Sequence, residues 1–248
     1  MTFYPIDKEL NSFRVVGTGV LGKLSEHNEA VKLSFEGFTS TESGCLVNYK
    51  NLRILTFDDN LTRLEDLLLK GTQVEYFSFP KNLKELINNP FDEGLPIKMI
   101  SVHPENNYFV VHDGALYSKD MKIIYLIFGG NGMVQFNVPN SVIELAPGCF
   151  SISNTLQHII IPCSVKIIQR WQFIRMTSIQ YIEIQNFESA VTIDEYGLFL
   201  ETNKDKSIIH YKPYNISIRN KGLEYQSCKH EHLFLNLFFI YCLILILQ

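Results

Sequence analysis

A six-residue phrase, apolar-x-x-apolar-x-apolar, recurs along most of the 248-residue chain. The last apolar residues of successive copies are Phe35, Phe57, Phe79, Val102, Val138, Ile161 and Ile184. The steps between them are 22, 22, 23, 36, 23 and 23 residues. Recurrence at this length is the signature of a solenoid, in which each repeat buries its apolar face against its neighbours. The sequence therefore predicts a repeat solenoid, an elongated stack of coils.

The phrase itself indicates a short β-strand. Its last two apolar residues lie two positions apart, so both face the same side of an extended chain. Proline follows the phrase at Pro80, Pro139 and Pro162, where the missing N–H ends a hydrogen-bonded ladder. The second half of each unit repeats as well: Val142, Leu145 and Phe150 are followed 23 residues later by Val165, Ile168 and Phe173. We therefore expect parallel β-strands stacked in coils of 22–23 residues.

The long step of 36 residues contains an insertion at about residues 106–128. Asp113 and Gly114 lie there between two runs of β-forming residues, 108–111 and 115–117, a pattern typical of a hairpin turn. We expect a β-hairpin between the two series of coils. A weaker echo of the pattern, at residues 194–199, predicts less regular coils after Ile184.

The chain divides into four predicted regions. Residues 1–29 form an N-terminal cap region, residues 30–218 the repeat solenoid, residues 219–232 a polar linker and residues 233–247 a hydrophobic segment. The N-terminus carries proline and charged residues where a secretory signal needs an apolar core, so no signal peptide is predicted.

The segment Leu233–Leu247 contains fourteen apolar residues and Asn236. As a helix it would span about 22 Å, less than the roughly 30 Å hydrocarbon core of a membrane. We expect a C-terminal hydrophobic helix that serves as a membrane anchor. The alternative is an apolar tail that packs onto the last coil. Basic residues lie before this segment and none follow it, which by the positive-inside rule places the body in the cytoplasm.

Composition narrows the class of function. Lys and Arg number 22 and Asp and Glu number 26, so the net charge is −4. The chain therefore lacks the basic excess that nucleic-acid binding needs, and no nucleic-acid partner is predicted. Five cysteines occur without a Cys-x-x-Cys pair, so no zinc ribbon is indicated.

Residues 140–150, 156–162 and 164–173 resemble the BspA-type leucine-rich repeat, as does the hairpin phrase at 113–117. The resemblance covers roughly residues 50–200 and is best from 97 to 184. This family is abundant among surface antigens of trichomonad parasites and occurs in some bacteria. Its members resemble adhesins that bind host or matrix proteins, and many end in a transmembrane helix. The resemblance implies a non-enzymatic protein for protein–protein recognition at the cell surface, with no catalytic residues and no cofactor.

In such solenoids the outward strand positions form a concave sheet surface. The register predicts one column of Tyr76, Met99, Gln135, His158 and Tyr181, and a second of Ser78, Ser101, Asn137, Ile160 and Glu183. Aromatic anchors supply most of the binding energy in protein interfaces, so we predict that these columns bind a protein partner. The alternative is an ordinary solvent-facing sheet, which carries the same kinds of residues.

Three other functions compete with this prediction. An intracellular scaffold would use the same columns, with its tail packed on the last coil or held at an internal membrane.

The Gly17–Gly22 segment fits G-x-G-x-x-G and would, in a nucleotide-binding enzyme, hold a pyrophosphate, with Glu36 on the ribose. A turn that leads into the first coil explains these glycines better, because no βαβ pattern follows.

Cys228, His230 and His232 alternate as zinc ligands on a strand would, yet no fourth ligand accompanies them, so no metal site is predicted.

Overall fold

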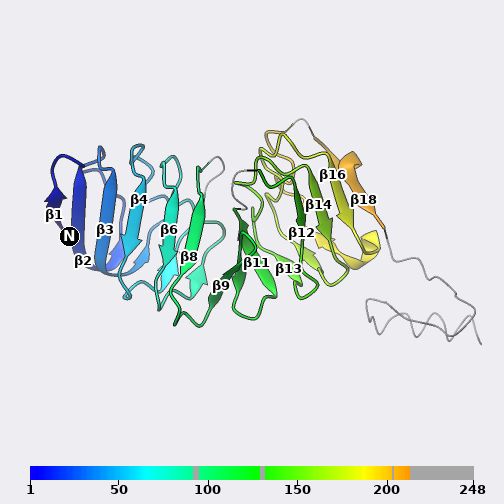
Figure 1. Ribbon diagram of the computed structural model, residues 1–248, viewed down its shortest axis with the longest axis horizontal. Coiled ribbons are helices and arrows are strands. Elements are labelled where there is room, and N and C mark those ends of the chain that lie inside the picture. Colours follow the sequence, from blue (N-terminus) through cyan, green and yellow to red (C-terminus); the bar gives the residue numbers. More distant parts are fainter. Residues whose placement is uncertain (92–94, 129–131, 203, 213–248) are drawn as a thin grey trace, which may run out of the picture.

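The computed structural model describes residues 1–91, 95–128, 132–202 and 204–212. The described chain is almost entirely β-strand and turn (Figure 1). The strands are β1 (Thr2–Asp7), β2 (Ser12–Leu21), β3 (Lys32–Thr41), β4 (Ile54–Phe57), β5 (Arg63–Leu64), β6 (Tyr76–Phe79), β7 (Glu85–Leu86), β8 (Met99–Val102), β9 (Phe109–His112), β10 (Ala115–Ser118), β11 (Ile123–Ile127), β12 (Gln135–Asn137), β13 (Glu144–Leu145), β14 (His158–Ile161), β15 (Ile167–Ile168), β16 (Tyr181–Ile184), β17 (Thr192–Ile193) and β18 (Ile209–Tyr211). Two short 3-10 helices, η1 (Glu188–Ala190) and η2 (Lys206–Ile208), interrupt the last coils.

Each coil contributes one longer strand to a main ladder of parallel pairs. In the first series β3, β4, β6 and β8 pair in register through their inward-facing residues Leu33, Leu55, Phe77 and Ile100. In the second series β12, β14, β16 and β18 do the same through Phe136, Ile159, Ile182 and Ile209. The predicted solenoid of parallel strands in coils of about 23 residues is therefore confirmed.

Short strands on the return half of the coils, of two residues each except for the five-residue β11, form a second ladder. β5 and β7 pair in the first series, and β11, β13, β15 and β17 pair in the second. The chain reverses between the ladders in tight turns, in which the backbone N–H of Leu83, Val142 and Val165 donates to the carbonyl of Pro80, Pro139 and Pro162, respectively. The prolines therefore end the main strands and shape the turns that follow.

The insertion forms the expected hairpin, and its second strand, β10, is largely buried inside the molecule. β9 and β10 pair antiparallel around Asp113 and Gly114, which both have positive φ angles, as a two-residue hairpin turn requires. β10 also pairs with β11, so these three strands form a layer between the two series of coils. Successive residues of β10 serve different cores: Leu116 packs in the first core, whereas Ala115 and Tyr117 pack in the second. We call β9–β11 the septum.

The septum corrects the expectation of one continuous concave surface. β8 is the last main strand of one sheet, and β12 is the first strand of another (Figure 1). The main ladder is thus divided into two blocks where the sequence shows the 36-residue step. Each block has its own hydrophobic core, and the septum lies between them with β10 largely buried.

The N-terminal end of the stack is covered. β1 pairs antiparallel with β2, and β2 pairs parallel with β3. Phe3, Phe13 and His27 close the end of the first core. The imidazole of His27 stacks on the Phe13 ring at 4.3 Å and is tilted against the Phe3 ring at 5.0 Å, measured between centroids. Pro5 lies in β1, an edge strand, where a missing N–H discourages pairing with another chain.

No helix in the described part of the chain is long and apolar enough to cross a membrane. The predicted polar linker and the predicted C-terminal hydrophobic helix lie outside the described residues.

The side chain of Tyr117 is fully buried in the septum, and its hydroxyl has no hydrogen-bond partner among the described residues. Burial raises the pKa of this phenol to about 12. Because an unsatisfied buried hydroxyl costs free energy, we expect Tyr117→Phe to leave the free energy of unfolding unchanged or to raise it by up to about 1 kcal/mol. Urea denaturation measures this difference, and a loss of more than about 1 kcal/mol would mean that the hydroxyl is hydrogen-bonded.

Candidate functional site

The outward face of the first block carries an apolar strip. Ile54, Tyr76 and Met99 occupy paired positions on β4, β6 and β8, and their exposed fractions are 43%, 48% and 52%. They alternate with buried Leu55, Phe77 and Ile100, so the strand period of two places them all on one side. Three adjacent strands thus present large apolar side chains to solvent.

Polar groups border the apolar strip on both sides. Glu75 lies between two cations, with its carboxylate 2.6 Å from Lys98 Nζ and 3.9 Å from Arg53 Nη1. The hydrogen bond from Lys98 is the main reason that the pKa of Glu75 is lowered and the pKa of Lys98 is raised. On the other side, Ser101 Oγ lies 3.0 Å from Ser78 Oγ. An apolar centre with a polar rim is the usual anatomy of a protein interface.

The outward face of the second block is more polar, and its centre is Tyr181. The Tyr181 ring stacks on His210, with 4.5 Å between centroids, and meets His158 edge-on at 6.1 Å. Lys212 Nζ lies 5.1 Å from the centroid of the Tyr181 ring and 2.9 Å from the Glu183 carboxylate. The hydrogen bond from Lys212 is the main cause of the lowered pKa of Glu183. We call these five residues the tyrosine cluster.

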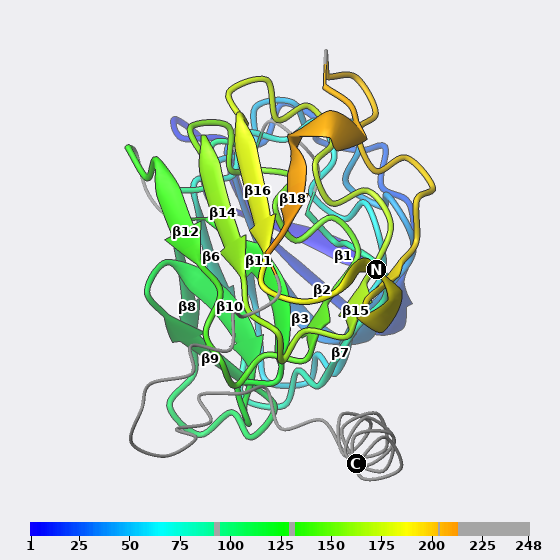
Figure 2. The ribbon, with the colours of Figure 1, turned by 90° about the vertical axis from the view of Figure 1, so that its right-hand side faces the viewer.

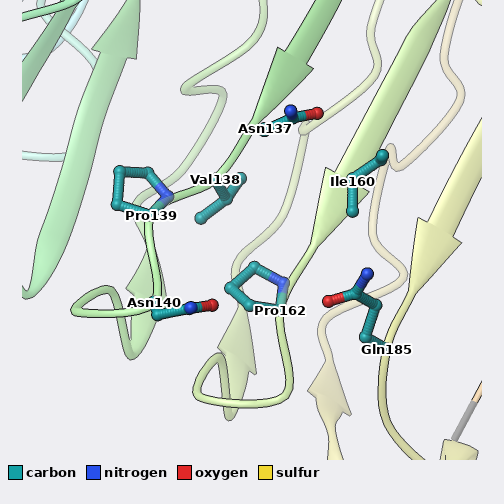
Figure 3. A pocket seen from close by; sticks show the side chains of 7 residues that line it. All are labelled: Asn137, Val138, Pro139, Asn140, Ile160, Pro162 and Gln185. Atoms are coloured by element: carbon teal, nitrogen blue, oxygen red, sulfur yellow. The ribbon is translucent and has the colours of Figure 1, made fainter. Parts of the chain in front are cut away.

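An open hollow of about 330 Å³ lies beside the tyrosine cluster, where β12 and β14 end (Figure 3). Its lining combines two prolines, three amides and two aliphatic side chains: Asn137, Val138, Pro139, Asn140, Ile160, Pro162 and Gln185. The turns after successive main strands supply the prolines, so the hollow is a product of the repeat. Its amides can donate and accept hydrogen bonds to a peptide backbone.

All ten residues predicted for the binding columns lie on outward strand positions, but the structure brings them together in two groups. Tyr76, Ser78, Met99 and Ser101 lie on the first block. Gln135, Asn137, His158, Ile160, Tyr181 and Glu183 lie on the second block. No main-ladder pairing joins Met99 to Gln135 in the described residues, because β8 and β12 belong to different sheets.

His210 and Lys212 were missed by the sequence analysis. The register places them beside Glu183 and Gln185, since Ile184 pairs with Tyr211. The step from β16 to β18 is 27 residues rather than 23, because η1 and η2 lengthen the last coil. The sequence does carry a signal for this strand, because the apolar residues Ile209 and Tyr211 alternate with the polar His210.

The glycine-rich segment does not form a phosphate loop. Gly17 and Gly19 lie within β2, and the next element is the strand β3 rather than a helix. The Phe38 ring packs directly over Gly17, where a Cβ would overlap it. The adjacent hollow has no Lys or Arg side chain in its lining, which consists of Met1, Val16, Gly17, Thr18, Val20, Gly22 and Phe38. The segment also differs from the predicted turn, because it is a long strand with a bulge near Gly19.

The described residues contain no group of three His, Cys, Asp or Glu side chains arranged to hold a metal ion. Cys228, His230 and His232 lie outside the described residues. Cys45 and Cys149 are buried free thiols, and desolvation raises the pKa of each, to about 12 for Cys45. Such thiols are inert.

Comparison with known families and structures agrees with this geometry. The family model of the BspA type leucine-rich repeat region matches residues 24–98 and 122–230 in six copies. No curated protein sequence matches the chain.

Among solved structures, a leucine-rich cell surface protein from Faecalibacterium prausnitzii is 20% identical, with a TM-score of 0.57 over 68% of this chain and 48% of the other. A leucine-rich repeat protein from Eubacterium ventriosum is 14% identical, with a TM-score of 0.53 over 76% of this chain and 71% of the other. The pneumococcal vaccine antigen PcpA is 15% identical, with a TM-score of 0.53 over 75% and 51%. This chain therefore spans about half the length of the first and the third, and identities this low show a shared fold alone.

The stacked coils of about 23 residues define a leucine-rich repeat protein, a class that typically recognises other proteins and works without catalysis. More narrowly, the chain belongs to the BspA-type leucine-rich repeat family, because the family model covers well over half of it. The resemblance inferred from the repeat phrases is thereby confirmed.

Proposed function

We propose that this chain is a non-enzymatic recognition protein that acts at the cell surface and adheres to host or matrix proteins. The observation that carries the proposal is the apolar strip of Ile54, Tyr76 and Met99, exposed on a strand face and bordered by polar groups. Tyrosine is enriched among the residues that dominate binding energy, and methionine adapts to irregular partner surfaces.

The tyrosine cluster supports a second contact area on the other block. Its ring stack and its Lys212–Glu183 pair hold Tyr181 in place. A side chain that is already ordered loses little conformational entropy when a partner binds. The two areas differ in chemistry, so each block of the proposed surface would contact a different part of the partner.

Two of the structural neighbours support a surface location, since one is described as a cell surface protein and another as a vaccine antigen. In this proposal the hydrophobic segment Leu233–Leu247 anchors the chain in the membrane. The intracellular scaffold is the alternative location for the same recognition surface.

We expect the double substitution Tyr76→Ala with Met99→Ala to weaken binding at least about tenfold, because each truncated anchor costs more than about 1 kcal/mol. The assay measures saturable binding of the purified chain to intact epithelial cells and to deposited extracellular matrix. Pretreatment of these surfaces with protease shows whether the ligand is a protein.

The matched control is Tyr108→Ala with Ile143→Ala, which removes similarly exposed side chains away from the strip. This control should bind like the native chain, and both variants should keep the native melting temperature. Equal binding by both variants would remove the strip from the site. Absence of saturable binding to either surface would contradict adhesion.

Protease treatment of intact cells tests the location. Cells express the chain with an N-terminal tag, and loss of the tag shows that the solenoid faces outward. A protected tag that sediments with membranes indicates a cytoplasmic face and the scaffold alternative. A protected tag in the soluble fraction contradicts the anchor.

A further inference from the structure

The N-terminal cap covers only one half of β2. β1 pairs with β2 from Ser12 to Val16, whereas β2 continues to Leu21 and pairs with β3 up to that residue (Figure 1). In the described part of the chain, no backbone hydrogen bond outside the β2–β3 ladder reaches Gly17–Val20. The second half of β2, Gly17–Leu21, is therefore a strand edge whose outward backbone donors and acceptors no strand pairs. We call it the free edge.

The free edge lies at the end of the stack opposite the tyrosine cluster. In the end view of Figure 2, β1 and β2 lie at the far end of the stack, behind β16 and β18. The apolar strip begins on β4, so the free edge shares no residue with either proposed contact area. A ligand bound here would be additional to a partner on the strand faces.

A hollow of about 360 Å³ adjoins the free edge. Val16, Thr18 and Val20 line it from alternate positions of β2, so the hollow lies on one face of the strand. The Phe38 ring, which packs over Gly17, adds an apolar wall. Because no charged side chain lines the hollow, its chemistry fits an apolar side chain of a ligand.

Glycines give another backbone room to approach the free edge. No atom lies within 4 Å of the position that a Cβ of Gly19 would take. Glycine inside a strand often marks a place where another backbone comes close. Edges that stay unpaired are commonly blocked by proline or by charged side chains, and Gly17–Leu21 contains neither, whereas β1 carries Pro5.

The direction of β1 fixes the direction of an added strand. A segment on the line of β1 runs antiparallel to β2, as β1 does, so its first residue lies near Gly22 and its last near Met1. The Glu42 carboxylate lies beside Gly22, with Oε2 3.6 Å from the position of a Cβ there. Glu42 makes no ion pair in the part of the chain that the structure describes. A basic residue at the start of the segment would complement this charge.

We propose that the free edge binds an extended peptide segment of a protein partner, antiparallel to β2 and with a basic residue at its start. Backbone hydrogen bonds to β2 supply the affinity, and an apolar side chain in the hollow supplies selectivity. This strand addition is a second mode of recognition, since the other two contact areas use side chains on strand faces.

Short peptides test the proposal on the full chain. The probes are acetylated and amidated hexapeptides, Lys-Thr-X-Thr-X-Thr, in which X is Val, Leu, Phe or Met. At least one is expected to bind with a Kd below about 1 mM. At saturation it should slow hydrogen–deuterium exchange of residues 17–22 at least about tenfold. Absence of binding by every probe, or slowed exchange only elsewhere, would overturn the proposal.

Methylated probes test the strand geometry. One version of the best probe is methylated on its odd backbone nitrogens and another on its even ones. Alternate N–H groups of an added strand face β2, so one version should lose binding and the other should keep it. Equal behaviour of the two versions would contradict strand addition. A probe with Glu in place of Lys should bind more weakly, and equal binding would remove Glu42 from the site.

Val20→Lys is expected to weaken probe binding at least about tenfold, because it places a charge at the free edge and in the hollow. The matched control is Val47→Lys, which changes another exposed valine and should bind like the native chain. Both variants should keep the native melting temperature. Equal probe binding by the two variants would overturn the proposal. Exchange at residues 17–22 that slows with chain concentration alone would assign the free edge to a second copy of the chain, which also overturns it.

Discussion

Phe79→Ala is expected to lower the free energy of unfolding by about 3–5 kcal/mol. Phe79 is fully buried at the end of β6, and its ring lies 5.4 Å from Phe77, 6.3 Å from Phe91 and 5.3 Å from Phe109, between centroids. Phe109 belongs to the septum, so Phe79 joins the coils of the first block to the layer between the blocks. Truncation leaves a cavity that borders both the coils of the first block and the septum. It also removes three ring contacts, each worth about 0.5–1.5 kcal/mol.

Urea or guanidinium denaturation measures this loss, with tryptophan fluorescence and circular dichroism as two probes. The control is Tyr108→Ala, which removes an exposed ring next to Phe109 and should change stability by less than about 0.5 kcal/mol. A loss below about 2 kcal/mol for Phe79→Ala would show that the first core refills the cavity. If only one probe shifted, the two blocks would unfold separately.

The core columns could be predicted from the sequence because every coil places its residues in the same environment. Leu33, Leu55 and Phe77 recur at steps of 22 residues, and the structure pairs them directly. A solenoid has mainly nearest-neighbour contacts, so the register of one coil predicts that of the next. The outward columns follow from the same register, which is why all predicted surface residues lie on strand faces.

The septum could not be predicted in the same way. Ala115, Leu116 and Tyr117 are consecutive and all buried, so neither face of β10 shows the alternation of an exposed strand. A hairpin turn at Asp113 and Gly114 is visible in the sequence, but its position between two cores depends on contacts with both series of coils. The division of the recognition surface follows from that position.

The longest strands could not be predicted either, because a bulge extends them past the end of the repeat phrase. β2 and β3 have ten residues each, and their register shifts between Val16 and Gly19. At this shift Gly37 of β3 has a φ of +84°, and a Cβ there would overlap the carbonyl oxygen of Gly17. The N–H of Gly37 also donates to Asp58 Oδ2 at 2.9 Å, which connects β3 to the turn after β4.

Gly37→Ala is therefore expected to lower the free energy of unfolding by about 3 kcal/mol or more. A left-handed backbone costs an ordinary residue about 1–2 kcal/mol, and relief of the backbone overlap must move β2 away from β3. Displacement of β3 would also lengthen the hydrogen bond to Asp58.

Gly19→Ala separates the two causes. Gly19 has a φ of +72°, but no atom lies within 4 Å of the position of its Cβ. This variant should lose only the conformational cost, about 1 kcal/mol, in the same denaturation experiment. The difference between the two variants measures the close approach of β2 and β3. Equal losses would mean that the backbone overlap at Gly37 is relieved without cost, and that conformation alone requires glycine at both positions.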